Sequence, residues 1–389
     1  MEYAIISKHV VRSNKCLRKN QKLSKKQYGK VRGQGPKLKI NKLYNVDAVD
    51  FMDLTGENTV KEQVQVPKDL TEDILIKALR NNALTGLSGN GYSTADKLEQ
   101  FSKHKNSKGV LIINSVECDP GLAHDEWLLR NRFQEVKKGI EVLNHCFSFQ
   151  VILLATKLPF PLVDAKIKTI QVPNRYPMGY EKVLLKSLLD IDLHDDEYPA
   201  QRGILVLNIQ TVLAIGAIIC SGKKLDSRYL TVEDLTTGKA VVVKAYMGTD
   251  AKEVITKAFP KGSKEPIYVG EGVMNSHPLE KAEKISAVTN YITYGKEPAY
   301  HEASKCKGCG GCNRKCPMQI NVKQIVKKTE SGDLTGIEQF HLERCIGCNS
   351  CTYVCHAGKN LKEIIAGAKE YCTKIHEPGG MKYEGRISH

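Results

Sequence analysis

Residues 306–317 read CKGCGGCNRKCP, and residues 345–355 read CIGCNSCTYVC. Both stretches have the spacing C-x2-C-x2-C-x3-C, in which three thiolates of one tight loop hold one [4Fe–4S] cluster and the fourth ligates the other cluster of the pair. Eight of the thirteen cysteines lie in these stretches. The spacing therefore predicts a C-terminal domain, residues 300–389, that holds two [4Fe–4S] clusters.

The exchange of fourth cysteines defines two ligand sets. We expect one cluster on Cys306, Cys309, Cys312 and Cys355, and the other on Cys345, Cys348, Cys351 and Cys316. The alternative is a pair of structural zinc sites, but zinc knuckles use two C-x2-C pairs with a longer spacer between them. Several cations flank the two cysteine runs: Lys305, Lys307, Arg314, Lys315 and Arg344. Positive charge at these positions raises the reduction potentials of the clusters.

The rest of the chain has the composition of an ordinary globular protein, with 389 residues of which 41% are hydrophobic. No N-terminal signal pattern is visible, and this many cysteines in an intracellular chain indicate metal or redox chemistry. The longest apolar run, residues 203–220, has the length of a membrane span. Asn208, Gln210 and Thr211 near its middle favour a buried strand that passes into a helix. We expect a cytoplasmic protein.

The net charge of +15 is concentrated at the N-terminus, where residues 1–42 hold thirteen Lys or Arg and a single acid. Such a segment is either a solvated extension or a contact surface for nucleic acid, anionic lipid or an acidic protein. It lacks the interleaved aromatic residues of a nucleic-acid surface. We therefore expect no nucleic acid; the first interpretation of the segment is a solvated extension, and the second is a contact with an acidic partner such as a ferredoxin or a flavodoxin.

Periodicity places an α/β layer in the middle of the chain. Buried strands are predicted at residues 110–114, 149–155 and 167–172, and helices at residues 67–83, 94–101, 127–146 and 181–188. This alternation predicts a mostly parallel sheet over residues 66–235. A small α+β module follows at residues 236–299, with a strand at 239–245 and a helix at 251–258. Residues 1–65 are predicted to be partly β or mobile.

Two motifs in the α/β layer have the pattern of a ligand site. The first is the loop at residues 86–97, GLSGNGYSTADK, where Gly86, Gly89 and Gly91 precede a helix. Glycines at this place let backbone amides approach a phosphate, and Lys97 adds a positive charge. Gly-rich turns before helices are common, so the loop alone does not identify a ligand.

The second motif is the turn at residues 114–121, NSVECDPG, directly after a predicted strand. It places Asn114 and acidic groups at the carboxyl edge of a parallel sheet, where ligands bind. The alternative is that Glu117 and Asp119 cap the helix around residues 125–130.

Together these motifs resemble the RnfC-like family, which forms the C subunit of Rnf-type electron transport complexes. More distantly, they resemble the NADH-oxidising flavoprotein of complex I. The resemblance covers about residues 69–366 and includes the segments NRYPMGYEK at 174–182 and VLNIQTVLA at 206–214. It implies an α/β fold made of a Rossmann-like flavin/NADH-binding layer, a small β-grasp (SLBB-like) module and a C-terminal ferredoxin-like dicluster domain.

The resemblance also implies the cofactors and their contacts. FMN would be contacted by Gly86, Gly89, Gly91, Lys97 and Asn114, with Asn208 and Thr211 near its phosphate or ribityl chain. Glu117 and Glu181 would lie on the nicotinamide side as the catalytic residues, with NADH as substrate. The implied function is electron transfer from NADH through FMN and the two clusters to a partner redox protein.

The chain departs from the family pattern in the glycine loop. Ser88, Asn90 and Ser93 stand where Gly, Ala and Pro are common, and the side chains of Ser88 and Asn90 would crowd a flavin. A flavin-free iron–sulfur relay without NADH chemistry is therefore the alternative function. In both cases we expect hetero-oligomeric contacts with other redox subunits, and peripheral contact with the cytoplasmic face of a membrane complex.

Overall fold

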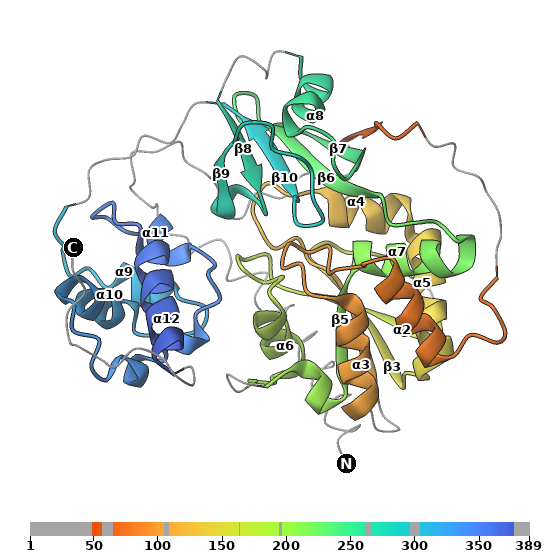
Figure 1. Cartoon of the computed structure of the whole chain (residues 1–389), viewed down its shortest axis with the longest axis horizontal. Coiled ribbons are helices and arrows are strands. Elements are labelled where there is room, and N and C mark those ends of the chain that lie inside the picture. Colours follow the sequence, from red (N-terminus) through yellow and green to blue (C-terminus); the bar gives the residue numbers. More distant parts are fainter. Residues whose placement is uncertain are drawn as a thin grey trace. The chain divides into compact units, whose positions relative to one another are not determined.

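The computed structural model describes residues 49–56, 65–104, 109–162, 164–193, 197–260, 266–295 and 304–376, the last four as backbone only. The basic segment at residues 1–42 lies outside these ranges. The described residues form two compact units, residues 49–295 and residues 304–376. The first unit contains two sheets, and the second contains both cysteine runs (Figure 1).

The α/β layer is built on a four-stranded sheet in which every pair of neighbours is parallel. Its strands, in spatial order, are β4 (Ile167–Gln171), β3 (Val151–Thr156), β2 (Val110–Ser115) and β5 (Ile204–Asn208). All residues of β2, β3 and β5 are buried, as their continuous apolar sequences require in a parallel sheet with both faces covered. The predicted α/β layer is confirmed.

Helices cover both faces of this sheet. They are α2 (Glu72–Asn81), α3 (Thr94–His104), α4 (His124–Asn131), α5 (Phe133–Phe147), α6 (Glu181–Leu189) and α7 (Ile209–Ser221). Leu111 and Ile113 of β2 pack in a core with residues of α2, α3, α5 and α7, whereas Val110 and Ile112 pack with α6. This division follows from the alternation of side chains along a strand. The helix predicted at residues 127–146 is two helices, separated at Arg132.

The long apolar run resolves into β5 followed directly by α7. Asn208, between the two elements, caps α7 by accepting a hydrogen bond from the amide of Gln210 at 2.8 Å. Across the ranges that the structure describes, no helix has the length and apolar character that a membrane crossing requires.

The second sheet has six strands in the order β1-β7-β6-β10-β8-β9. Its members are β1 (Asp50–Asp53), β6 (Ser227–Asp234), β7 (Lys239–Tyr246), β8 (Ile267–Gly270), β9 (Ser276–Pro278) and β10 (Tyr291–Tyr294). The hairpin β6–β7 is antiparallel, helix α8 (Ala251–Ala258) follows it, and β10 returns parallel to β6. This is the β-grasp arrangement expected from the resemblance, extended by β1 along β7.

The boundaries of this module differ from the prediction. Strand β6 lies before residue 235, and β1 lies within the predicted N-terminal segment, yet both pair with β7. Local periodicity detects only one strand at a time, so it cannot show that β1 pairs with a strand 191 residues farther along the chain. The β-grasp sheet therefore begins earlier than residue 236.

The second unit contains four α-helices in its described part, which are α9 (Gly311–Lys315), α10 (Val322–Ser331), α11 (Ser350–Tyr353) and α12 (Leu361–His376). Helices α10 and α12 pack against each other. Single-turn 3-10 helices occur in both units, at Pro199–Arg202, Val273–Asn275, Ile337–Phe340 and Leu342–Arg344.

Candidate functional site

The two cysteine loops share one backbone conformation. Gly308 and Gly347, which precede the second cysteine of each loop, both have a φ of 66°. Two positions later, φ is 69° at Gly310 and 63° at Asn349, and a short helix begins at the next residue in each loop. These left-handed positions suit glycine and, less often, asparagine. The duplicated sequence motif is therefore a duplicated structure.

Cys316 leaves its own loop and joins the cysteines of the other. It lines one pocket with Cys345, Cys348 and Cys351, among the apolar side chains of Met318, Ile320, Val322, Ile346 and Ile365. In the reciprocal position, the thiols of Cys355 and Cys309 interact with the thiol of Cys312. The structure thus brings Cys316 together with Cys345, Cys348 and Cys351, and Cys355 together with Cys309 and Cys312.

Burial dominates the chemistry of the enclosed thiols. It raises the pKa of Cys351 to about 12, with the neighbouring thiols of Cys348 and Cys345 adding to the effect. Burial also raises the pKa values of Cys348, Cys316 and Cys312. A metal bound to such thiols displaces their protons, so that the buried sulfurs can serve as thiolate ligands.

The spacing of the sulfur atoms differs from that of a zinc site. Four sulfurs around one zinc ion lie about 3.8 Å apart, because each Zn–S bond is about 2.3 Å. The described residues include all eight cysteines of the two runs, and no three of their sulfurs lie within 4.8 Å of one another. Within the described residues, these sulfurs therefore form no group with the close spacing of four ligands around one zinc ion.

In the α/β layer, the predicted ligand residues meet at the carboxyl edge of the parallel sheet. Asn114 and Asn208, which lie at the ends of neighbouring strands, are direct register partners. The Asn114 carboxamide donates to the carbonyl oxygen of Gly179 at 2.9 Å, and thereby ties strand β2 to the segment that leads into α6. Asn208 donates to Asp125 Oδ2 at 2.6 Å.

The glycine loop is held against this edge by hydrogen bonds. The hydroxyl of Thr211 in α7 accepts a hydrogen bond from the amide of Leu87 at 3.0 Å, and the amide of Gly86 donates to the carbonyl of Tyr92 at 2.7 Å. Within the described parts of the chain, the amides of residues 88–91 donate to no acceptor. Gly89 and Gly91 have φ values of 112° and 62°, which glycine adopts far more readily than any other residue. The loop thus keeps a run of free backbone donors.

Lys97 and Glu181 lie together beside the loop. The Lys97 ammonium, on α3, and the Glu181 carboxylate, at the start of α6, form an ion pair at 2.9 Å. Both side chains keep about a quarter of their surface exposed, at 22% and 28%. The second oxygen of Glu181, Oε1, is buried and has no partner within the described chain. This oxygen therefore keeps an unused capacity to accept a hydrogen bond.

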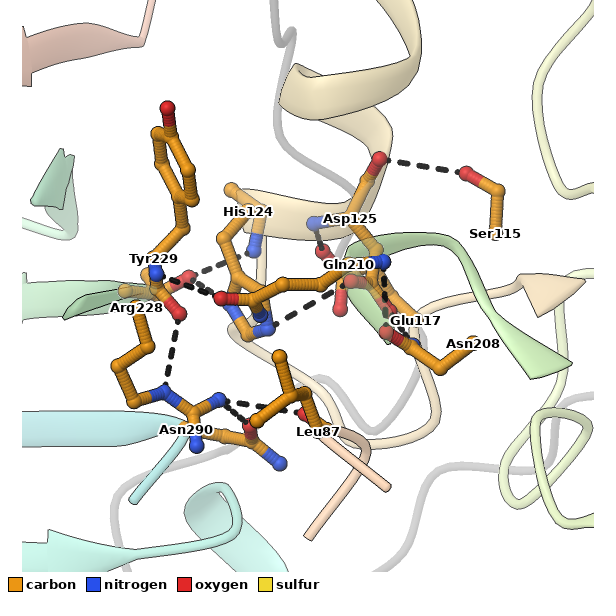
Figure 2. Close-up of polar contacts among 12 residues, drawn as sticks. Leu87, Ser115, Glu117, His124, Asp125, Asn208, Gln210, Arg228, Tyr229 and Asn290 are labelled. Atoms are coloured by element: carbon orange, nitrogen blue, oxygen red, sulfur yellow. Dashed lines mark hydrogen bonds and ion pairs between the residues drawn. The ribbon is translucent and has the colours of Figure 1, made fainter. Parts of the chain in front are cut away.

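Glu117 is deeply buried and caps helix α4, as in the alternative interpretation of the acidic turn. Its Oε1 accepts a hydrogen bond at 2.6 Å from the amide of Asp125, which lies in the first turn of the helix (Figure 2). Burial raises the pKa of Glu117 well above its usual value, and the charge of Asp125 adds to the shift. Asp119 instead accepts the amide of Met274 in the β-grasp module at 2.9 Å.

Three buried polar residues at this edge escape prediction from the sequence: His124, Asp125 and Arg228. Arg228 in β6 is 1% exposed and donates to the carbonyls of Leu87 and Ala287 and to Asn290 (Figure 2). It thereby clamps the glycine loop to the β-grasp module.

The same burial shifts the acid–base chemistry of this group. The pKa of Asp125 rises to about 7, mainly through burial. Burial, together with the charge of Arg228, lowers the pKa of His124 to about 3. The oxygen and nitrogen atoms of Glu117, His124 and Asp125 lie close enough to hold a metal ion, but the buried guanidinium beside them disfavours a cation. The one signal in the sequence for His124 and Asp125 is the polar run His-Asp-Glu directly before the apolar residues 127–129.

Comparisons with known proteins agree with this geometry. Residues 79–217 match the family model of the Nuo51 FMN-binding domain, and residues 298–356 match that of the 4Fe-4S dicluster domain. Similar curated proteins include the C subunit of the ion-translocating oxidoreductase complex of Vibrio cholerae, 27% identical over 71% of this chain and 37% of the relative. The corresponding protein of Pseudomonas aeruginosa is 26% identical over 64% of this chain and 34% of the relative. The chain thus matches little more than a third of these relatives' length.

Among solved structures, NAD+-reducing [NiFe]-hydrogenase in the H2-reduced state is similar, with a TM-score of 0.54 at 14% identity, over 82% of this chain and 68% of that one. The air-oxidised state of the NAD+-reducing [NiFe]-hydrogenase has a TM-score of 0.52 at 16% identity, over 81% of this chain and 65% of that one. At this identity the likeness establishes the fold. The matches confirm the resemblance found in the sequence: the chain is a homologue of the C subunit of ion-translocating oxidoreductase complexes, with a Nuo51 FMN-binding domain and a 4Fe-4S dicluster domain.

Proposed function

We propose that the chain is an electron-transfer subunit that takes electrons from NADH at FMN and passes them through two [4Fe–4S] clusters to a partner redox protein. One observation carries the proposal. Four segments distant in sequence, around Gly86, Asn114, Glu181 and Thr211, meet at one sheet edge through hydrogen bonds of 2.9–3.0 Å. The same chain holds the two cysteine sets.

The residues at this edge fit FMN in their chemistry. The run of amides at 88–91 and the Lys97 ammonium would hold the anionic and polar parts of the cofactor, and Asn114 would add a carboxamide donor. The unpartnered Oε1 of Glu181 supplies an acceptor. FMN, when bound, supplies the conversion of a two-electron hydride donor into single-electron transfers.

The two acidic residues expected on the nicotinamide side have different roles. Glu181 is partly exposed and would face the substrate, held in orientation by its ion pair with Lys97. Glu117 is 5% exposed and holds the amide of Asp125, so it acts as a positioning residue for α4 and, through Asp125, for Asn208. These roles support one acidic residue that faces the substrate, Glu181, rather than two.

The proposal also includes the redox assembly in which the chain works. The names of the relatives and solved structures indicate multi-subunit redox assemblies, and we propose that this chain also works as one subunit of such an assembly. It would contact a membrane complex peripherally, on the cytoplasmic face.

The flavin-free relay is kept as a second candidate because of the glycine loop. A Cβ on Gly86 would lie 2.9 Å from Oδ1 of Asn90, and one on Gly89 would lie 3.0 Å from Nδ2 of Asn290. Protein side chains therefore already line the faces of two of the glycines. The exposed Asn90 carboxamide can rotate away from an incoming ligand at small cost, whereas the carboxamide of Asn290 is buried and held by Arg228.

Bound flavin separates the two candidates. Anaerobically reconstituted protein is gel-filtered after incubation with FMN, and flavin is then measured per chain beside iron and sulfide. We expect Lys97→Ala to weaken FMN binding about tenfold or more, since a lost hydrogen bond to a charged group is worth about 1.5–3 kcal/mol. Lys103→Ala on the same helix, whose side chain is 66% exposed and paired with Glu99, is the matched control.

Full iron and sulfide without flavin in the unsubstituted protein would establish the relay instead. Equal flavin in the Lys97 and Lys103 variants would remove Lys97 from the proposed site.

A further inference from the structure

Lys157 is a buried cation at the carboxyl edge of the parallel sheet that the proposed function does not use. It follows β3 directly and is only 8% exposed. Its carbonyl oxygen accepts a hydrogen bond from the Gln171 carboxamide at 3.0 Å, but within the described ranges its ammonium forms no hydrogen bond and no ion pair. Burial accordingly lowers the pKa of Lys157. A negative charge beside the ammonium would stabilise it.

The acidic side chains around Lys157 are held by other donors. Three carboxyl groups lie near it, and each accepts a hydrogen bond from elsewhere in the chain: Glu117 from the amide of Asp125, Asp119 from the amide of Met274, and Glu126 from Arg130. Burial raises the pKa of Glu117 well above its usual value, so this carboxyl keeps its proton to a higher pH than an ordinary glutamate. The strongest charge interaction of Lys157 is instead with the thiol of Cys118.

Cys118 lies in the turn at residues 114–121, at the same edge of the sheet. Ser115 and Thr156 are the last register partners of β2 and β3, so the residues that follow them leave the sheet side by side. Cys118 is half-buried, which leaves it within reach of a small reagent. Elsewhere in the chain, burial raises the pKa values of the Cys220 and Cys372 thiols. A half-buried cysteine beside a cation is, by contrast, the environment of a reactive thiol.

The turn that carries Cys118 packs closely against the segment that leads into α6. A Cβ built on Gly179 would lie 2.9 Å from the Cβ of Cys118 and 2.4 Å from the carbonyl oxygen of Val116. Gly179 also accepts the hydrogen bond from Asn114, and Glu181 follows two residues later. A group added to the sulfur of Cys118 therefore enlarges a side chain at a contact that has little spare room.

We propose that Cys118 is a redox-sensitive modification site, where hydrogen peroxide oxidises the thiolate that Lys157 stabilises. The thiolate sulfur attacks one peroxide oxygen, so that an S–O bond forms and the O–O bond breaks. The sulfur loses two electrons and becomes a sulfenic acid, and the leaving hydroxide takes up the proton that the thiol released and becomes water. The enlarged side chain loosens residues 179–182. The effect of this loosening on electron entry rests on the proposed function, whereas the modification does not.

Peroxide labelling tests the site without NADH or flavin. The anaerobically reconstituted full chain is treated with hydrogen peroxide and dimedone, which traps sulfenic acids, and each cysteine peptide is quantified by mass spectrometry. We expect labelling of Cys118 to be about tenfold faster than that of Cys146, which is also half-buried, on α5.

Substitutions of the lysine test its part in the reaction. Lys157→Met should slow the labelling of Cys118 about tenfold, because the loss of the nearby positive charge lowers the fraction of thiolate, and Lys157→Arg should restore most of the rate. Lys168→Met, at an exposed position of the neighbouring strand β4, is the matched control and should leave the rate unchanged. Equal labelling of Cys118 and Cys146 in the unsubstituted protein, or an unchanged rate in Lys157→Met, would overturn the proposal.

Hydrogen exchange measures the structural consequence. Oxidation should increase exchange at residues 179–182 in the unsubstituted protein and leave it unchanged in Cys118→Ala. Equal exchange before and after oxidation would overturn the coupling between the thiol and the segment of Glu181. Since neither readout uses NADH or FMN, a failure of the hydride chemistry would leave both results as they are.

Discussion

The contact between helices α5 and α7 gives a sharp test of the packing that supports the site. A Cβ built on Gly139 would lie 1.9 Å from the carbonyl oxygen of Val212, whereas unstrained contacts between such atoms are about 3.5 Å. Gly139→Ala therefore requires the helices to separate by more than about 1 Å. The atom in the way is backbone, which cannot rotate aside.

Two effects of this substitution oppose each other. Alanine in place of glycine within a helix stabilises the helix, and with it the folded protein, by about 0.8–1.0 kcal/mol. Overpacking of a close interface costs about 1–3 kcal/mol, and the upper end applies because only whole-helix movement relieves the clash. We expect net destabilisation of about 1–2 kcal/mol. Because α7 carries Thr211, its displacement also loosens the hydrogen bond to Leu87 and lowers FMN retention.

Chemical denaturation of the reconstituted protein measures the change in the free energy of unfolding, and Gly367→Ala is the control. Gly367, in α12, has no atom within 4 Å of a built Cβ, so its replacement is expected to stabilise its own unit by about 0.5–1 kcal/mol. If Gly139→Ala stabilised the protein as Gly367→Ala does, the close contact of α5 and α7 would be refuted.

Three further predictions concern the two sites. Cys355→Ser and Cys309→Ser should abolish the EPR signal of one cluster, and Cys316→Ser should abolish that of the other cluster. Each variant should keep about four of the eight iron atoms. Loss of the same signal in all three variants would contradict the exchange of fourth cysteines. Because the pKa of Asp125 is raised from 3.8 to about 7 in the fold, folded protein keeps a proton that the unfolded chain releases, and stability should fall as pH rises from about 4 to about 7. Asp125→Asn should make that fall smaller, with the remainder belonging to Glu117, whose pKa burial also raises; urea unfolding at a series of pH values measures the slope, and an unchanged slope would assign the fall to other groups. Arg228→Met should lower the free energy of unfolding by about 1–3 kcal/mol and increase hydrogen exchange in the glycine loop, because it leaves buried carbonyl oxygens without donors. Unchanged protection of the glycine loop from exchange would exclude the clamp.

Local sequence signals predict the elements that form the site with small errors. The apolar run at 110–114 is strand β2, residues 110–115, and the helix predicted at 251–258 begins and ends at those residues. Asp250 caps that helix by accepting from the amides of Lys252 and Glu253. The cysteine sets follow from spacing because the ligand geometry of a cube constrains short loops more strongly than tertiary packing does.

Long-range contacts leave no such local signal. Nothing in the neighbouring residues distinguishes Arg228, in a strand, from a solvated arginine, since its partners lie up to 141 residues away. The capping role of Glu117 and the bond from Met274 to Asp119 likewise depend on how separate segments pack. The interruption at Arg132 is hidden because the apolar pattern of a helix continues across it.

An anaerobic titration of the reconstituted protein with NADH, followed by visible absorbance and EPR, tests the proposed electron path most directly. With one FMN and two [4Fe–4S] clusters per chain, we expect reduction of the flavin and of both clusters, with an uptake approaching about four electrons at the most reducing poise. Stoichiometric zinc in place of iron and sulfide, or full clusters that NADH leaves oxidised in the presence of bound FMN, would contradict it.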